Sequence, residues 1–173
     1  KVLSRIWSGY SFIFIFAVIF LAYYLVNPNL TWVGVMNILR HSAVVVIIAL
    51  GAGLIIITGQ IDLSVGSIVG ICDMLAAALI LGGMNIYLAI VLVLLIGAGI
   101  GFVNGVIVTK LKIPYFIGTL ATMQILRGLV YVKTKGVPLY GVSYKEFTVL
   151  GQGYLGVVPL PVVIAIVVIA LSY

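Results

Sequence analysis

Long apolar runs without charge are the feature that most limits what this chain can fold into. No acid, lysine or arginine lies between Arg40 and Asp62, and from Asp62 to Lys110 only Asp73 adds a charge. Only 7% of the residues are charged, against about 25% in a typical soluble domain, so the chain could not cover a water-facing surface with charge. Its surroundings must therefore be mostly lipid.

These runs predict an all-α fold, a polytopic membrane helical bundle with about six spanning helices, since one span needs roughly 20 apolar residues. The predicted spans are residues 9–26, 42–58, 64–81, 86–108, 114–132 and 156–173. Residues 30–39 predict a short interfacial helix, and residues 133–155 form a long polar connection. Strands are not expected, because the runs lack the period-two alternation of an outer-membrane barrel.

The basic residues, which give a net charge of +6, are scattered at the edges of the apolar runs. They form no basic stripe, so they predict anchoring at the membrane interface and no binding of nucleic acid. The pair Lys110 and Lys112 lies in a short connection, which favours a cytoplasmic N-terminus. The first run lacks a small-residue cleavage pattern and predicts an uncleaved span.

A short polar break, residues 59–66, separates the second and third runs. Its Asp62 is predicted to cap the third helix by accepting backbone N–H groups, and Ser64 is a rival cap. The alternative is that this break is a polar hinge at which the third helix begins inside the bundle.

Asp73 is a second acid whose position needs an explanation. It lies roughly 16 Å beyond Asp62 along the helix and close to mid-bilayer. Placing an acid there costs at least about 2.5–3.5 kcal/mol, so it should be paired, protonated or face the bundle interior. Arg127 is predicted at a similar depth, which predicts a contact with Asp73, direct or through water. The alternative is that Arg127 extends to the outer interface.

Small and polar residues recur within the spans. Gly66 and Gly70, and likewise Gly97, Gly101 and Gly105, follow one another every four residues, which predicts close packing of helices. Other polar residues are predicted to hydrogen-bond across helices or to line a path for a polar solute; they are Asn104, Thr119, Thr122 and Gln124.

The sequence contains few residues suited to catalysis or to cofactor binding. It has no phosphate-binding G-x-x-x-x-G-K-[ST] motif, no metal-ligand cluster and no Ser/His/Asp set. With three acids and one histidine it offers almost no acid–base groups. We therefore expect no enzyme activity, no catalytic residues, no metal and no cofactor in this chain, with any nucleotide used by another subunit.

Four ordered blocks identify a family resemblance. Residues 57–66, Ile-Thr-Gly-Gln-Ile-Asp-Leu-Ser-Val-Gly, resemble the T-G-G-I-D-L-S-V-G signature of the ribose-type permeases of bacterial ABC sugar importers, within the branched-chain/ribose superfamily. Asn104-Gly105 is similar to the family's N-G, residues 113–120 to I-P-P-F-I-x-T-L, and Arg127-Gly128 with residues 134–136 to its R-G and T-x-G. Gln60, Tyr115 and Asp73 depart from the pattern.

The resemblance implies a multi-pass permease subunit in the bacterial inner membrane. Family members are similar in having about ten helices, so residues 1–173 look like one transmembrane permease domain truncated on its C-terminal side, before the ATPase-coupling loop. The implied partners are membrane lipid, a second permease subunit (identical or different), a cytoplasmic ABC ATPase and an extracytoplasmic binding protein that delivers ribose or another monosaccharide. The predicted pathway residues are Asp62, Ser64, Asp73, Asn104, Thr119 and Arg127.

Three alternatives stay open. A permease of the same superfamily could carry a nucleoside, a signalling sugar or a branched-chain amino acid. A self-contained secondary transporter could use Asp73 as its proton or ion site. A membrane scaffold would move no solute at all.

Overall fold

The computed structural model describes residues 2–27, 31–139 and 145–172, and most of them are helical. In the described part the helices are α1 (Val2–Val26), α2 (Trp32–Ile57), α3 (Val65–Leu81), α4 (Ile86–Thr109), α5 (Tyr115–Thr134), α6 (Lys145–Gln152) and α7 (Leu160–Ser172). The strands β1 (Tyr154–Leu155) and β2 (Val158–Pro159) form a short ribbon between α6 and α7. The predicted all-α class is confirmed apart from this ribbon, which was not expected.

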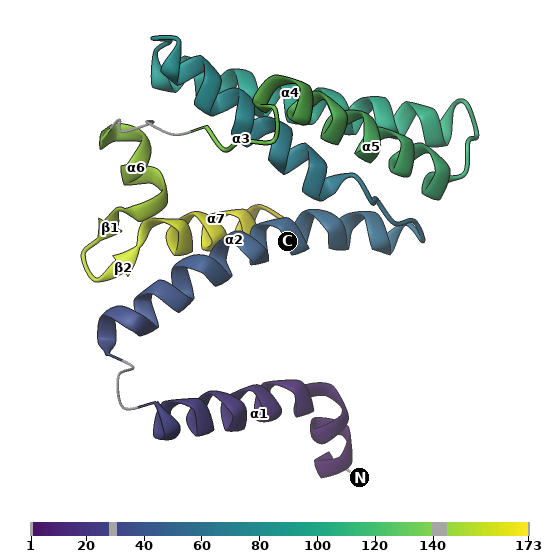
Figure 1. Cartoon of the computed structure of the whole chain (residues 1–173). Helices are drawn as coiled ribbons and strands as arrows, with labels where there is room; N and C mark the ends of the chain where they lie inside the picture. The colour runs from purple at the N-terminus through teal and green to yellow at the C-terminus, as the bar shows by residue number, and fades with distance from the viewer. Residues whose placement is uncertain (1, 28–30, 140–144, 173) are drawn as a thin grey trace.

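The helices form two packed groups (Figure 1). In the first group α3 packs against both α4 and α5, and its core is built on Ile71, Met74 and Leu126. In the second group α7 lies along α2, with α6 and the ribbon at one end. The helix α1 lies apart from both groups. The predicted pathway residues all lie in this first group or just before α3.

Local chemistry sets the ends of the central helices. The helix α2 ends before Gly59, whose φ of 77° is the left-handed conformation that closes many helices, and α3 ends before Gly83 with a φ of 84°. The side chain of Asn85 caps α4, because its Oδ1 accepts the N–H groups of Tyr87 and Leu88 at 3.0 and 3.3 Å. The predicted boundaries of the third and fourth spans, 64–81 and 86–108, and the predicted end of the second at residue 58 are confirmed to within one residue.

The predicted short interfacial helix over residues 30–39 is wrong. The structure has one continuous helix, α2, whose first turn is capped by Thr31: its Oγ1 accepts the N–H of Gly34 at 3.3 Å. No proline interrupts residues 32–57, so nothing separates an interfacial piece from the span that follows.

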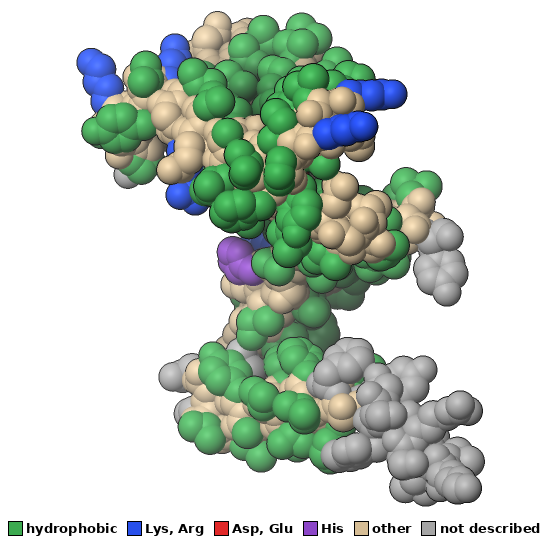
Figure 2. Space-filling model, turned by 90° about the vertical axis from the view of Figure 1, so that its right-hand side faces the viewer, with side chains coloured by type: hydrophobic (Ala, Val, Ile, Leu, Met, Phe, Trp, Pro, Cys, Tyr) green, Lys and Arg blue, Asp and Glu red, His purple; other side chains and the backbone are tan. Residues whose placement is uncertain are grey.

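Among the described residues, α2, α4 and α5 are long and apolar enough to cross a membrane. The helix α3 has 17 residues and α7 has 13, fewer than the roughly 20 that were expected of each span. In α3 the polar break takes up the start of the run without being helical, and α7 begins late because β2 and Pro159 occupy its start. Figure 2 shows hydrophobic side chains over most of the face it displays, as a lipid-facing protein requires.

The ribbon is tied to α2 by Arg40. A two-residue turn joins Leu155 to Val158, with Gly156 at a φ of 65°, the conformation that the first position of a type II′ turn needs. The guanidinium of Arg40 lies 5.0 Å from the ring centre of Tyr154, and its Nη2 donates to the carbonyl oxygen of Gln152 at 3.4 Å. Arg40 therefore contributes a cation–π contact and a hydrogen bond that hold the ribbon on α2.

Replacing Tyr154 with leucine should loosen the ribbon, whereas Tyr154→Phe should not. Phenylalanine keeps the ring face that attracts Arg40, a contact of about 0.5–1 kcal/mol at an exposed site. The check is hydrogen exchange at the N–H of Leu160, which donates to the carbonyl oxygen of Gly153 at 2.8 Å. Exchange should speed up about two- to fivefold in the leucine variant. Equal acceleration in both variants would remove the cation–π contact as the cause.

Candidate functional site

The helix α3 begins inside the bundle. Ser64, which immediately precedes it, has no exposed surface at all. The Oδ1 of Asp62 accepts the backbone N–H of Ser64 at 2.7 Å and its hydroxyl at 2.6 Å. Asp62 thus accepts one backbone N–H, that of Ser64, but the prediction that it caps α3 is wrong, because Ser64 occupies the cap position. The hydroxyl of Ser64 makes no capping bond and binds Asp62.

Side chains from α4 and α5 converge on this buried helix start. Asn104 of α4 donates from Nδ2 to the Oγ of Ser64 at 2.8 Å, and its Oδ1 accepts the hydroxyl of Thr122 at 2.6 Å. On α5, the Oγ1 of Thr119 accepts the N–H of Leu63 at 3.3 Å and donates to the carbonyl oxygen of Tyr115 at 2.8 Å. We call these residues the polar junction: Asp62, Ser64, Asn104, Thr119 and Thr122.

The polar junction supplies hydrogen-bond partners to the non-helical backbone just before α3. Backbone groups that lie at membrane depth outside a helix need partners, since lipid supplies none. Here Asp62 and Thr119 provide them. This geometry matches the alternative that the break is a polar start of α3 within the bundle, and it confirms the predicted cross-helix bonds of Asn104 and Thr122. Thr119 bonds to the break and to its own helix. The predicted cross-helix bond of Gln124 is not found in the described part of the chain, where its side chain is exposed.

A small cavity of about 150 Å³ adjoins the polar junction. Two of its lining residues, Gln60 and Tyr115, are departures from the family pattern described above. The others are Ile55, Ile61, Asp62, Gly101, Asn104, Gly105, Val108 and Thr119. The polar junction therefore borders open space as well as packed helix.

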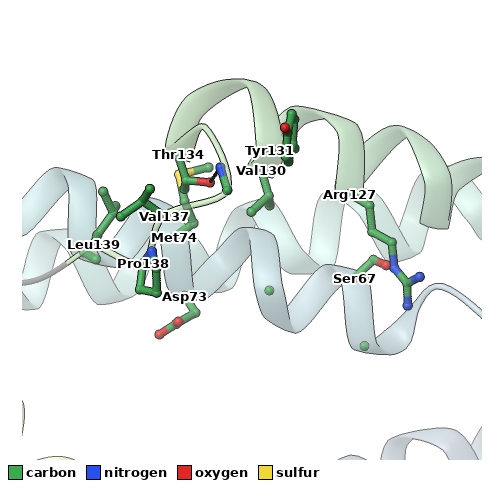
Figure 3. A pocket seen from close by; sticks show the side chains of 14 residues that line it. Ser67, Asp73, Met74, Arg127, Val130, Tyr131, Thr134, Val137, Pro138 and Leu139 are labelled. Atoms are coloured by element: carbon green, nitrogen blue, oxygen red, sulfur yellow. Dashed lines mark hydrogen bonds between the residues drawn. The ribbon is translucent and has the colours of Figure 1, made fainter.

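A larger cavity of about 500 Å³ lies between α3, α5 and the segment after α5 (Figure 3). Asp73, Arg127 and Ser67 all line it. Figure 3 shows Ser67 and Arg127 toward one end and Asp73 toward the other. We call it the α3–α5 cavity; its lining residues are Gly66, Ser67, Gly70, Asp73, Met74, Ala77, Arg127, Val130, Tyr131, Thr134, Gly136, Val137, Pro138 and Leu139.

Asp73 and Arg127 share this cavity without a direct bond. Among the described residues no ion pair joins them, and Figure 3 shows Asp73 pointing away from Arg127. The predicted direct contact is therefore absent: the two residues line opposite ends of one cavity.

The predicted site residues thus fall into two places. Asp62, Ser64, Asn104 and Thr119 belong to the polar junction, whereas Asp73 and Arg127 belong to the α3–α5 cavity. Sequence reasoning missed Ser67. Its signal was its position beside Gly66, Gly70, Asp73 and Ala77, which recur at helical spacing along one face of α3.

The glycines that were predicted to allow close helix packing occupy two kinds of position. At Gly97 a Cβ would lie 3.3 Å from the Sγ of Cys72, so the predicted close packing of α3 and α4 is confirmed there. At Gly66, Gly70, Gly101 and Gly105 a Cβ would meet no atom within 4 Å, and these glycines line the two cavities. The close helix approach predicted at those four positions is not found, because a missing side chain there leaves space that no neighbouring helix fills.

Comparison with known proteins places the chain in a family. The model described as "Branched-chain amino acid transport system / permease component" matches residues 34–173. The chain belongs to this permease family. The ribose import permease proteins RbsC of Haemophilus influenzae and Bacillus subtilis are 39% and 38% identical to it, over 86% and 80% of this chain and 47% and 44% of their own length.

The autoinducer 2 import system permease protein LsrC of Photorhabdus luminescens is 31% identical, over 79% of this chain and 41% of its own length. The permease chain thus spans less than half the length of these curated relatives. No solved structure matches it.

The family blocks coincide with the geometry described above. The signature at residues 57–66 of this permease runs from the end of α2 to the first turn of α3, with Ser64 buried within it. Asn104-Gly105 lies where α4 meets the polar junction, and Arg127 lies in the α3–α5 cavity. The described residues contain no group of three or more His, Cys, Asp or Glu side chains that could hold a metal ion.

Proposed function

We propose that this chain is the transmembrane part of an ABC importer that translocates a small polar solute, ribose or another monosaccharide, across the bacterial inner membrane. The observation that carries the proposal is the α3–α5 cavity, where Asp73 and Arg127 face open space between otherwise apolar helices. Charged groups at membrane depth mark solute pathways, because lipid does not stabilise them. The ribose import permeases most resemble this chain among the relatives named above.

The buried start of α3 supports the same proposal. Transporters place binding sites beside helices that begin or break inside the membrane, where non-helical backbone borders a cavity. In this chain the polar junction and its small cavity have that arrangement.

The other subunits of the proposed importer would be separate polypeptides. In this proposal a second permease subunit, identical or different, completes the pathway, and an extracytoplasmic binding protein delivers the solute. A cytoplasmic ABC ATPase supplies the energy and uses the ATP, so this chain itself is not an enzyme and holds no cofactor. The N-terminus is cytoplasmic, because Lys110 and Lys112 lie in a short connection.

The test is uptake by proteoliposomes. The chain is reconstituted with the ATPase and the binding protein encoded nearest to its gene, and entry of radiolabelled D-ribose is measured. Uptake should need both ATP and the binding protein. Liposomes with a proton gradient and no ATP serve as the control. Uptake driven by that gradient alone would contradict the proposal and favour a secondary transporter that uses Asp73.

A signalling sugar is the second candidate solute, because the autoinducer 2 permease is also a relative. The same liposomes distinguish the two. ATP-dependent entry of autoinducer 2 with no entry of D-ribose would keep the importer and change its solute.

A further inference from the structure

We propose that the α3–α5 cavity is a binding site for a small uncharged polyhydroxy solute, which hydrogen-bonds to Ser67, Asp73 and Arg127. The inference rests on the proposed function and deepens it, since it names the residues that would recognise the solute and the chemistry they accept. The cavity of about 500 Å³ lies within the range of about 300–1,000 Å³ typical of small-molecule sites.

The first observation is an unsatisfied hydroxyl. Ser67 lines the cavity and is 6% exposed, and its Oγ is buried without any hydrogen-bond partner. Buried hydroxyls in proteins are almost always bonded, so one without a partner in a cavity wall indicates a partner that binds there. Figure 3 shows its oxygen beside the flexible side chain of Arg127, which can move aside for a ligand.

The second observation is the pair of separated charges. Arg127 offers only hydrogen-bond donors and Asp73 only acceptors when ionised. They line the same cavity without bonding each other, so both have capacity left for a ligand. A hydroxyl group can accept from Arg127 and donate to Asp73, and it can do either with Ser67.

The charges also limit what binds. The lining holds one acid and one base, so its formal charge sums to zero and an ionised solute would meet one like charge. A zwitterionic amino acid could pair with both groups only if its charges were far apart. Ser67, which lies at the Arg127 end of the cavity, is roughly 9 Å from Asp73 along α3, whereas both charged groups of an α-amino acid are attached to one carbon. A polyol carries hydroxyls along its whole length and fits this spacing.

The test places a reporter thiol between the two ends of the cavity. Gly70 lines the cavity, and a Cβ there meets no atom within 4 Å, so Gly70→Cys should fit. Cys72→Ala first removes the native thiol. Gly99→Cys on α4 is the matched control, because its Cβ would also be unhindered but Gly99 does not line the α3–α5 cavity. Both variants are made in the full chain, reconstituted with its partner subunits, and checked for assembly.

Labelling by a charged, membrane-impermeant thiol reagent is then measured with and without D-ribose. Gly70→Cys should react at least tenfold faster than Gly99→Cys, and D-ribose should slow it at least threefold. Leucine, as the amino-acid probe, should not slow the labelling of Gly70→Cys. Adding Ser67→Ala or Asp73→Asn to Gly70→Cys should raise the half-protecting ribose concentration roughly five- to tenfold, since each removes one hydrogen bond.

Equal labelling of the two thiols, absence of protection by D-ribose, equal protection by leucine, or unchanged protection in the Ser67→Ala variant would each overturn the inference. ATP-driven ribose uptake without protection would leave the proposed function standing and remove this site. Protection without ATP-driven uptake would keep the site and remove the proposed function.

Discussion

Replacing Asn104 with leucine is expected to lower the free energy of unfolding by about 1–3 kcal/mol. The side chain is buried and joins Ser64 on the α3 side to Thr122 on α5 through both of its polar atoms. Leucine is of similar size but can make neither bond, so the hydroxyl of Thr122 loses its acceptor. Unfolding of the purified protein in mixed micelles, followed by circular dichroism during an SDS titration, measures the change.

The control is Gln124→Leu on α5. Gln124 is exposed and has no hydrogen bond in the described part of the chain, so its replacement should change the free energy of unfolding by less than about 0.5 kcal/mol. Thr122→Val should cost less than Asn104→Leu, because it removes only one of the two bonds. Similar losses in Asn104→Leu and Gln124→Leu would mean that the polar junction does not stabilise the bundle.

Adding one methyl group should have opposite effects at two glycines. In Gly118→Ala the new Cβ would lie 2.9 Å from the Cγ2 of Ile107, a β-branched side chain with little freedom to turn away. This overpacking between α4 and α5 should lower the free energy of unfolding by about 1–3 kcal/mol. In Gly101→Ala nothing lies within 4 Å, so the higher helix propensity of alanine should raise it by up to about 1 kcal/mol.

The same SDS titration measures both glycine variants, and each serves as the control for the other. In an Ile107→Ala background, Gly118→Ala should cost less than in the unchanged chain, because the atom that clashes has been removed. A loss of similar size at Gly118 and Gly101 would show that helix packing in the first group differs from that described here.

The end of α2, both ends of α3 and the start of α4 could be predicted from the sequence because their causes are local. Gly59, Gly83 and Asn85 each act on backbone groups within a few residues, and so does Asp62 on Ser64. The pairing of Asn104 with Ser64 could not be predicted, since the two are 40 residues apart and only the packing of α3 on α4 brings them together. That both residues were predicted at the site depended on the family resemblance.

The glycine pattern shows why helix packing and cavities were harder to predict than helix ends. A glycine every four residues is equally compatible with a tightly packed helix face and with a cavity wall, because in both cases a side chain is missing. Gly97 is of the first kind and Gly70 of the second, and only coordinates distinguish them. Asp73 and Arg127 were predicted at one depth by helix rise, but the directions of their side chains depend on how α3 and α5 are rotated about their axes.

The hydrogen bonds at the start of α3 affect how this helix can move. Leu63 and Ser64, just before its first turn, are hydrogen-bonded to Thr119 of α5 and Asn104 of α4, whereas one face of the helix borders the unfilled α3–α5 cavity. Sliding α3 lengthwise would rupture the bonds to Asn104 and Thr119 together, but swinging its far end about Ser64 would leave them intact. Such a swing would instead have to separate Ile71 and Met74 from Leu126, so different contacts oppose the two kinds of movement.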